Sequence, residues 1–125
     1  MAAGAAFPRT VRLLKRDEFE GALRAPDWRS ANRYFRISAR HNEAGHARLG
    51  LAVPKRRVRR ATGRNRLKRI IRESFRVRQR ELPAWDFVVG IRSAAGEADN
   101  ATLFLALDEL WQRARGWPCD GSWSG

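Results

Sequence analysis

The sequence predicts an α+β fold in which helices cover a small mixed sheet. Three observations predict it. Two segments alternate apolar and polar residues, one segment is apolar almost throughout, and three segments repeat apolar residues at helical spacing. In chain order these segments give helix, strand, strand, helix, strand and helix, a pattern typical of layered α+β domains. With 125 residues, of which 43% are hydrophobic, the chain can build one core.

The first helix is expected from Lys15 to Leu23, because Phe19, Ala22 and Leu23 recur at helical spacing. Acidic residues in the first turn favour that start, and Pro26 ends the pattern. Trp28, which follows, is expected at a loop surface.

Two alternating segments come next. From Tyr34 to Arg40, one face is apolar and the other carries Tyr34, Arg36, Ser38 and Arg40. A turn-rich segment, residues 41–46, separates it from a second alternating run that ends at Pro54. We therefore expect the two runs to form a hairpin. The turn segment contains His41 and His46, which we interpret as turn residues because no catalytic partner accompanies them.

An amphipathic helix is predicted after residue 60 and should end near Leu82, before Pro83. Its inner positions are Leu67, Ile70, Ile71, Ser74 and Phe75. The segment from Asp86 to Arg92 is apolar enough for a central strand. A last helix should begin at a cap formed by Asp99 or Asn100. Its inner stripe is Leu103, Leu107, Leu110 and Ala114, and Trp85 and Trp111 are expected to pack in the interior.

Positive charge is concentrated in one part of the chain. The sequence holds 26 Lys and Arg against 13 Asp and Glu, a net charge of +13. Thirteen of these cations lie between Lys55 and Arg80, where Glu73 is the only acid. A phosphate backbone or an anionic membrane surface could each neutralise such a patch.

The cations of the basic helix follow its outer face. Helical geometry places Asn65, Arg69, Arg72, Arg76 and Arg80 on one outward ridge, where like charges repel unless a polyanion neutralises them. The alternative is a solvated helix face. A solvated face would normally mix acids among the bases, so the composition favours binding to a polyanion.

The segment GRNRLKRIIRESFR, from Gly63 to Arg76, resembles the Arg-Asn-Arg signature of the bacterial ribonuclease P protein family. The likeness extends through Phe7-Pro8-Arg9, Arg48-Leu49-Gly50 and Lys55-Arg56 to Asp86-Phe87-Val88-Val89, and it covers nearly everything from Phe7 to Arg115. It implies a two-layer α-β sandwich with a left-handed βαβ crossover, whereas general handedness rules would predict the opposite hand.

The resemblance also implies a function. Such a protein is a subunit of ribonuclease P and assists a catalytic RNA in removing the 5′ leader from precursor tRNA. Hydrolysis then uses Mg²⁺ held by RNA and substrate phosphates, and no side chain of this chain is expected to be catalytic. The residues expected to bind the catalytic RNA are Lys55, Arg56, Arg59, Arg60, Arg64, Asn65, Arg66, Lys68, Arg69 and Arg72.

By the same resemblance, a cleft between the first helix and the sheet holds the leader. Phe19, Tyr34, Arg36 and Ser38 are its expected contacts, since aromatic rings beside cations suit single-stranded RNA. Core packing is the alternative for Phe19. Leu23 departs from the aromatic residue that some members carry.

Two other classes of nucleic-acid-binding protein are alternatives for a chain with such a basic helix. A ribosomal or RNA-chaperone protein would need the basic helix but not the cleft, and a DNA-binding regulator is disfavoured because no helix-turn-helix pattern is visible.

The single cysteine, Cys119, gives no disulfide framework, and the first seven residues do not resemble a signal peptide. We therefore expect a cytoplasmic protein with one domain over residues 1–116 and a frayed tail over 117–125.

Overall fold

The computed structural model describes residues 15–116, so the tail and Cys119 lie outside the described residues. All six expected elements are present. They are α2 (Arg16–Arg24), β2 (Phe35–His41), β3 (Arg48–Ala52), α3 (Ala61–Arg78), β4 (Trp85–Ile91) and α4 (Asn100–Arg115). Two short 3-10 helices, η2 (Gln79–Glu81) and η3 (Ser93–Glu97), precede β4 and α4. No helix between residues 15 and 116 is long and apolar enough to cross a membrane.

The sequence did not predict one further strand, β1 (Trp28–Ala31), which pairs antiparallel with β2. Four residues are too few to show a convincing alternation. The strand turns Trp28 inward, so that its side chain is only 3% exposed and its ring lies 6.0 Å from that of Trp85. The expectation that Trp28 lies at a loop surface is therefore wrong.

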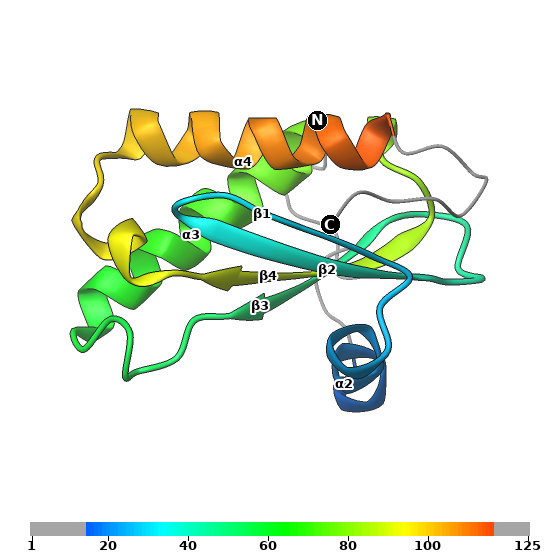
Figure 1. The fold of residues 1–125 in the computed structure, drawn as a ribbon, viewed down its shortest axis with the longest axis horizontal. Coiled ribbons are helices and arrows are strands. Elements are labelled where there is room, and N and C mark those ends of the chain that lie inside the picture. Colours follow the sequence, from blue (N-terminus) through cyan, green and yellow to red (C-terminus); the bar gives the residue numbers. More distant parts are fainter. Residues whose placement is uncertain (1–14, 117–125) are drawn as a thin grey trace, which may run out of the picture.

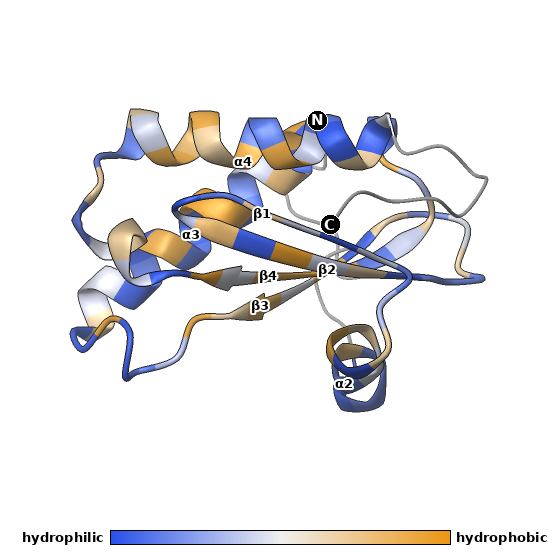
Figure 2. Ribbon diagram, viewed as in Figure 1, coloured by the Kyte–Doolittle hydropathy of each residue, from blue (hydrophilic) through white to orange (hydrophobic). Residues whose placement is uncertain are grey.

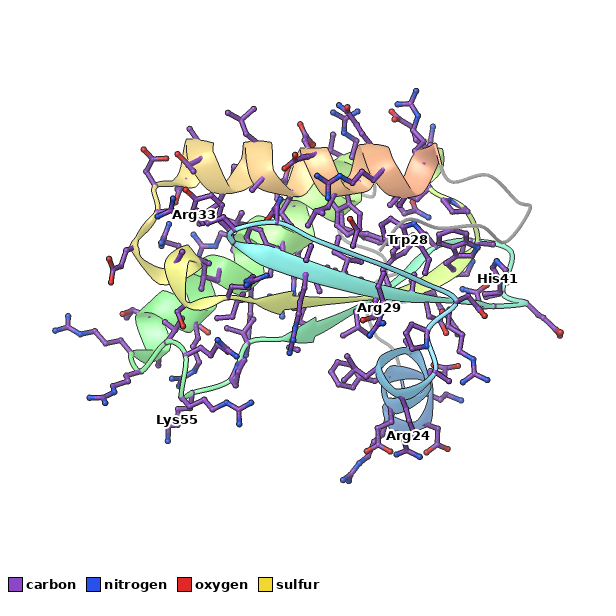
Figure 3. All side chains as sticks on the ribbon, in the orientation of Figure 1. Arg24, Trp28, Arg29, Arg33, His41 and Lys55 are labelled. Atoms are coloured by element: carbon purple, nitrogen blue, oxygen red, sulfur yellow. The ribbon has the colours of Figure 1, made fainter. Side chains whose placement is uncertain are left out.

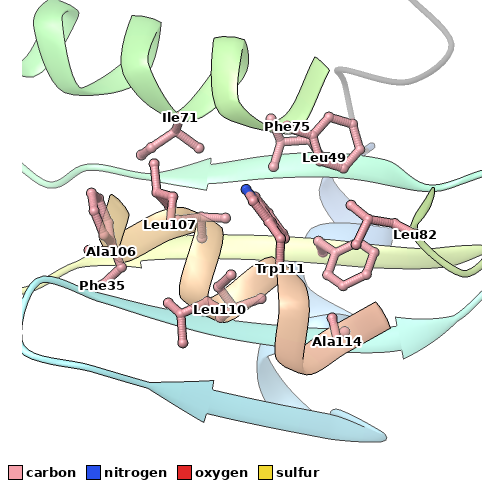
Figure 4. Close-up of a cluster of buried hydrophobic side chains, with 14 of the residues drawn as sticks. Phe35, Leu49, Ile71, Phe75, Leu82, Ala106, Leu107, Leu110, Trp111 and Ala114 are labelled. Atoms are coloured by element: carbon pink, nitrogen blue, oxygen red, sulfur yellow. The ribbon is translucent and has the colours of Figure 1, made fainter. Parts of the chain in front are cut away.

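The four strands lie in the order β1-β2-β4-β3. β4 pairs antiparallel with β2 and parallel with β3, so the two alternating segments do not form the expected hairpin. The reason is that β4, whose seven residues are all buried, takes the central position between them. α3 joins the parallel neighbours β3 and β4. Figure 4 shows the sheet from the side that α3 and α4 cover. In this view β3 and β4 both run leftward, and β3 lies above β4. Because α3 crosses in front of the sheet, the connection from β3 to β4 is left-handed.

A layer of two long helices covers one face of the sheet, and a single short helix lies on the other (Figure 1). α3 and α4 lie against one face, and α2 lies against the other. β2 shows the corresponding alternation, with hydrophobic and hydrophilic residues following each other along the strand (Figure 2). The face under α3 and α4 forms the main core, so the opposite face is left to α2 and to solvent.

The core confirms the predicted inner faces of both long helices. All five inner residues of α3 and all four of α4 are buried. Trp111 lies at the centre, edge-on to Phe75 and Phe87 at ring distances of 5.7 and 5.6 Å (Figure 4). Its indole Nε1 donates a hydrogen bond to Ser74 Oγ at 2.8 Å, which explains a polar residue in the apolar stripe. Trp85 is also buried, as predicted.

Candidate nucleic-acid interface

A positively charged surface covers the start of α3 and the loop before it. We call it the basic surface and define it by eight side chains: Lys55, Arg56, Arg59, Arg60, Asn65, Lys68, Arg69 and Arg72. All are exposed except Lys68, which is half-buried. Lys55 extends away from the molecule (Figure 3). Within residues 15–116, no carboxylate forms an ion pair with any of these eight. Their charge is thus available to a polyanion.

The C-terminal end of α3 differs, because its arginines have acidic partners. Arg76 Nη2 lies 2.6 Å from Glu73 Oε2, and Arg78 pairs with Asp108 at 3.2 Å and with Glu81 at 3.4 Å. The hydrogen bond from Arg76 lowers the pKa of Glu73. Arg76, which was predicted to lie on the outward ridge of the basic helix, is therefore neutralised by an acid of the same helix. The charge without an acidic partner is concentrated toward the start of the helix.

Two arginines of the signature hold other parts of the protein. Arg64 Nη1 donates to the carbonyl oxygens of Val58 at 3.0 Å and Arg59 at 2.8 Å. Arg66 donates to Asn100 Oδ1 at 2.6 Å and to the carbonyl of Ala98 at 3.1 Å. Arg64 therefore reaches the loop before α3, whereas Arg66 reaches the turn before α4, and the exposed Asn65 lies between them. Sequence alone could not show these bonds, because three of the four acceptors are backbone carbonyls and the fourth is a side chain 34 positions away.

The opposite face of the sheet is hollowed beside α2. One hollow of about 370 Å³ and another of about 510 Å³ share Leu23, Arg36 and Ser38 in their walls. We call the two together the sheet groove. Val88 and Gly90 of β4 add an apolar lining to the first hollow. A Cβ at Gly90 would lie 3.4 Å from Arg36 Nε, so the glycine lets the arginine lie close over the strand.

Cations surround the sheet groove on two sides. Arg29 and Arg92 line the second hollow, and Arg56 and Arg57 line the first. Figure 3 shows Arg29 on the side of β1 that faces α2. Arg56 belongs to both the basic surface and the groove, so the two surfaces meet there. An apolar lining bordered by cations suits a single strand, whose bases and phosphates need different contacts.

The structure brings together only part of the expected leader site. Arg36 and Ser38 line the sheet groove, together with Leu23, which is 46% exposed. Phe19 is half-buried on α2 and does not line either hollow. Tyr34 precedes β2, packs against the core and lies 5.9 Å from the guanidinium of Arg33.

The groove residues that sequence reasoning missed include Arg29, Arg57, Arg92, Val88 and Gly90. Arg29 was missed together with β1. Val88 could have been found, because in a central strand its side chain must point to the face opposite that of Phe87 and Val89.

A polar network holds α2 against the sheet. Arg48 of β3 forms a two-bonded pair with Asp86 of β4 at 2.8 and 3.0 Å, and its Nη2 also lies 3.0 Å from Glu18 Oε2 of α2. Asn42 donates to Asp86 at 2.7 Å. The hydrogen bond with Asp86 raises the pKa of Arg48. Through Glu18, this network helps to fix the helix that carries Leu23.

Comparison with known proteins identifies a close set of relatives. A family model described as Ribonuclease P matches residues 7–115. The chain is 70% identical over 122 residues to the ribonuclease P protein component of Halorhodospira halophila, covering 98% of this chain and 100% of that protein. It is 48% identical over 108 residues to the Escherichia coli K12 protein component, covering 86% and 90% of the two chains.

Solved structures agree with this similarity. The RNase P protein from Staphylococcus aureus superposes with a TM-score of 0.76 at 30% identity, covering 87% of this chain and 95% of that one. The RNase P protein from Thermotoga maritima superposes with a TM-score of 0.72 at 33% identity, covering 82% and 96%.

Proposed function

The chain belongs to the ribonuclease P protein family, and from that premise we propose how its two surfaces divide the binding of RNA. As the protein component, it acts with the ribonuclease P RNA in the ribonucleoprotein that processes tRNA 5′ ends. We assign the catalytic RNA to the basic surface and the 5′ leader of precursor tRNA to the sheet groove.

The basic surface suits a folded RNA. Seven of its eight side chains are long cations on one face of α3 and the loop before it, and aromatic residues are absent from these eight positions. Arginine and lysine in this arrangement bind phosphates without reading bases, and the binding depends strongly on salt. Partner acids are lacking for these cations within the described part of the chain, and this observation carries the assignment.

The sheet groove suits the leader because its chemistry is mixed. Leu23 and Val88 offer apolar surface to a base, while Arg36 and Ser38 can donate to phosphate or sugar oxygens. Since Arg56 lines the groove as well as the basic surface, a leader in the groove would lie next to the catalytic RNA. Tyr34 and Phe19 remain candidate contacts at the margin of this site.

We propose that the chemistry of cleavage belongs to the catalytic RNA. Mg²⁺ would be held by phosphates of the RNA and the substrate and would activate the attacking water. The residues of this chain would bind and orient the leader. We further propose a cytoplasmic location, because the tRNA precursors of a bacterium are made there.

The test uses two variants that each remove one charge, Arg36→Gln in the groove and Arg69→Gln on the basic surface. Precursors with leaders of decreasing length are bound to the complex assembled with each variant. Arg36→Gln should weaken binding of long-leader precursors and leave mature tRNA unaffected, whereas Arg69→Gln should weaken assembly with the catalytic RNA. An equal loss for Arg36→Gln at every leader length, including none, would contradict the assignment of the groove.

A further inference from the structure

The loop that carries half of the basic surface is folded against the start of α3. The backbone N–H groups of Arg57 and Val58 donate to the carbonyl of Pro54 at 3.1 and 3.3 Å. The Val58 side chain is partly buried against the core. A Cβ at Gly63 would lie 2.8 Å from Val58 Cγ1, so the helix can approach this side chain only because residue 63 is glycine.

Arg64 closes this arrangement from the helix side. Its Nη1 donates to two successive carbonyl oxygens of the loop, at 3.0 Å to Val58 and 2.8 Å to Arg59. The side chain is half-buried, unlike that of the exposed Arg69 five residues later. Hydrogen bonds from a charged donor are stronger than those between neutral groups, so these two bonds contribute substantially to holding the loop against the helix.

We infer that Arg64 is a positioning residue that holds the loop of residues 55–60 in its binding conformation before RNA arrives. The inference rests on the proposed function of the basic surface. Ordering a flexible loop of long cationic side chains reduces the affinity that their phosphate contacts supply. A loop that is already bonded to α3 avoids much of that cost, because its five cations, four of them in the basic surface, are presented beside Lys68, Arg69 and Arg72.

The first experiment measures the loop without RNA, by limited digestion with trypsin. The loop contains five trypsin sites, after Lys55, Arg56, Arg57, Arg59 and Arg60. Arg64→Lys keeps the charge and the trypsin site at position 64, but its side chain is one bond shorter than the arginine whose Nη1 makes both hydrogen bonds, so we expect both bonds to be weakened. Arg69→Lys is the matched control.

Cleavage in the loop should become about tenfold faster in Arg64→Lys, because digestion follows the population of the open form. It should stay within about twofold of the wild type in Arg69→Lys, where no contact is lost. The Arg64→Gln variant, compared with Arg69→Gln, repeats the test with a side chain that reaches neither carbonyl. Unchanged loop cleavage in both Arg64 variants, with circular dichroism showing a native fold, would overturn the inference.

The second experiment measures affinity for the catalytic RNA as a function of salt. Arg64→Lys should bind about tenfold more weakly with an unchanged slope of log affinity against log salt, since no cation is removed. Arg69→Gln should instead reduce the slope by roughly 0.7 to 0.9, the value for one phosphate contact. Normal RNA affinity in Arg64→Lys despite an opened loop would overturn the positioning role. Normal affinity and slope in Arg69→Gln as well would mean that the proposed function of the basic surface has failed.

Discussion

Replacing Arg48 with methionine should strongly destabilise the protein, because the change leaves a buried carboxylate without its main partner. The Asp86 side chain is only 8% exposed, and Arg48 supplies two of its hydrogen bonds. Removing one member of a buried ion pair costs about 3–5 kcal/mol. Asn42 still donates to Asp86, so we expect about 3 kcal/mol, at the lower end of that range.

The loss of the second partner adds less. Glu18 is 29% exposed on its side chain, so water can replace much of its pairing with Arg48. For a domain of this size, about 3 kcal/mol corresponds to a fall in melting temperature of roughly 10–15 °C. The free energy of unfolding is best measured by urea denaturation followed by circular dichroism, with unchanged denaturant dependence as the check on two-state behaviour.

A double-mutant cycle separates this explanation from simple loss of packing. If the unpaired Asp86 carboxylate causes the destabilisation, adding Asp86→Asn to Arg48→Met should cost much less than the sum of the two single changes. A coupling of about 1.5 kcal/mol or more is expected for groups in such close contact. Strictly additive effects, or a loss below about 1 kcal/mol for Arg48→Met, would refute the reasoning.

Three further predictions concern the core, a helix cap and the groove. Trp111→Phe leaves the buried hydroxyl of Ser74 without its donor and should cost about 1–3 kcal/mol of stability, part of which Ser74→Ala should restore in a melting experiment. The pKa of Asp99 is lowered chiefly by its hydrogen bond from the Thr102 backbone N–H, so the stability that it adds is present above the unfolded pKa and is lost as pH falls through the folded value. The melting temperatures of wild type and Asp99→Ala should therefore differ at pH 7 and converge below about pH 4, and a constant difference would contradict this role. Leu23→Phe should tighten binding of long-leader precursors, by at most the roughly 1–3 kcal/mol of one base stack, and leave mature tRNA unaffected in a filter-binding assay. Equal tightening of both RNAs would count against it.

The sequence predicted every element but β1 and the two short 3-10 helices, because five of the predicted segments have a periodic pattern and β4 is apolar throughout. The inner faces of α3 and α4 could be identified residue by residue, since burial there follows helical spacing. Strand pairing was harder. Alternation in β2 and β3 shows that each has one buried face, but not which strand lies beside it. The uniformly apolar β4 was recognised as central, yet the hairpin expected between β2 and β3 contradicts that position.

The candidate site was predictable in part, for a related reason. Charge density alone indicated the basic surface, because thirteen cations crowd into one segment. It did not indicate which arginines have partners inside the protein. Arg64 and Arg66 donate to backbone carbonyl oxygens, which every residue has. Arg48 pairs with Asp86, which is 38 positions away in the sequence. The groove depends on packing between α2 and the sheet, so Leu23 lines it although Phe19 has the more suggestive side chain.

The central claim is that two separate surfaces contact two different RNAs, and site-specific photo-crosslinking tests it most directly. A photoreactive amino acid is placed at position 23 in the groove or at position 69 on the basic surface, and the complex is assembled with catalytic RNA and a labelled precursor. Position 23 should crosslink to the leader, and position 69 to the catalytic RNA. Crosslinks from position 23 to the catalytic RNA, with none to the leader, would contradict the account.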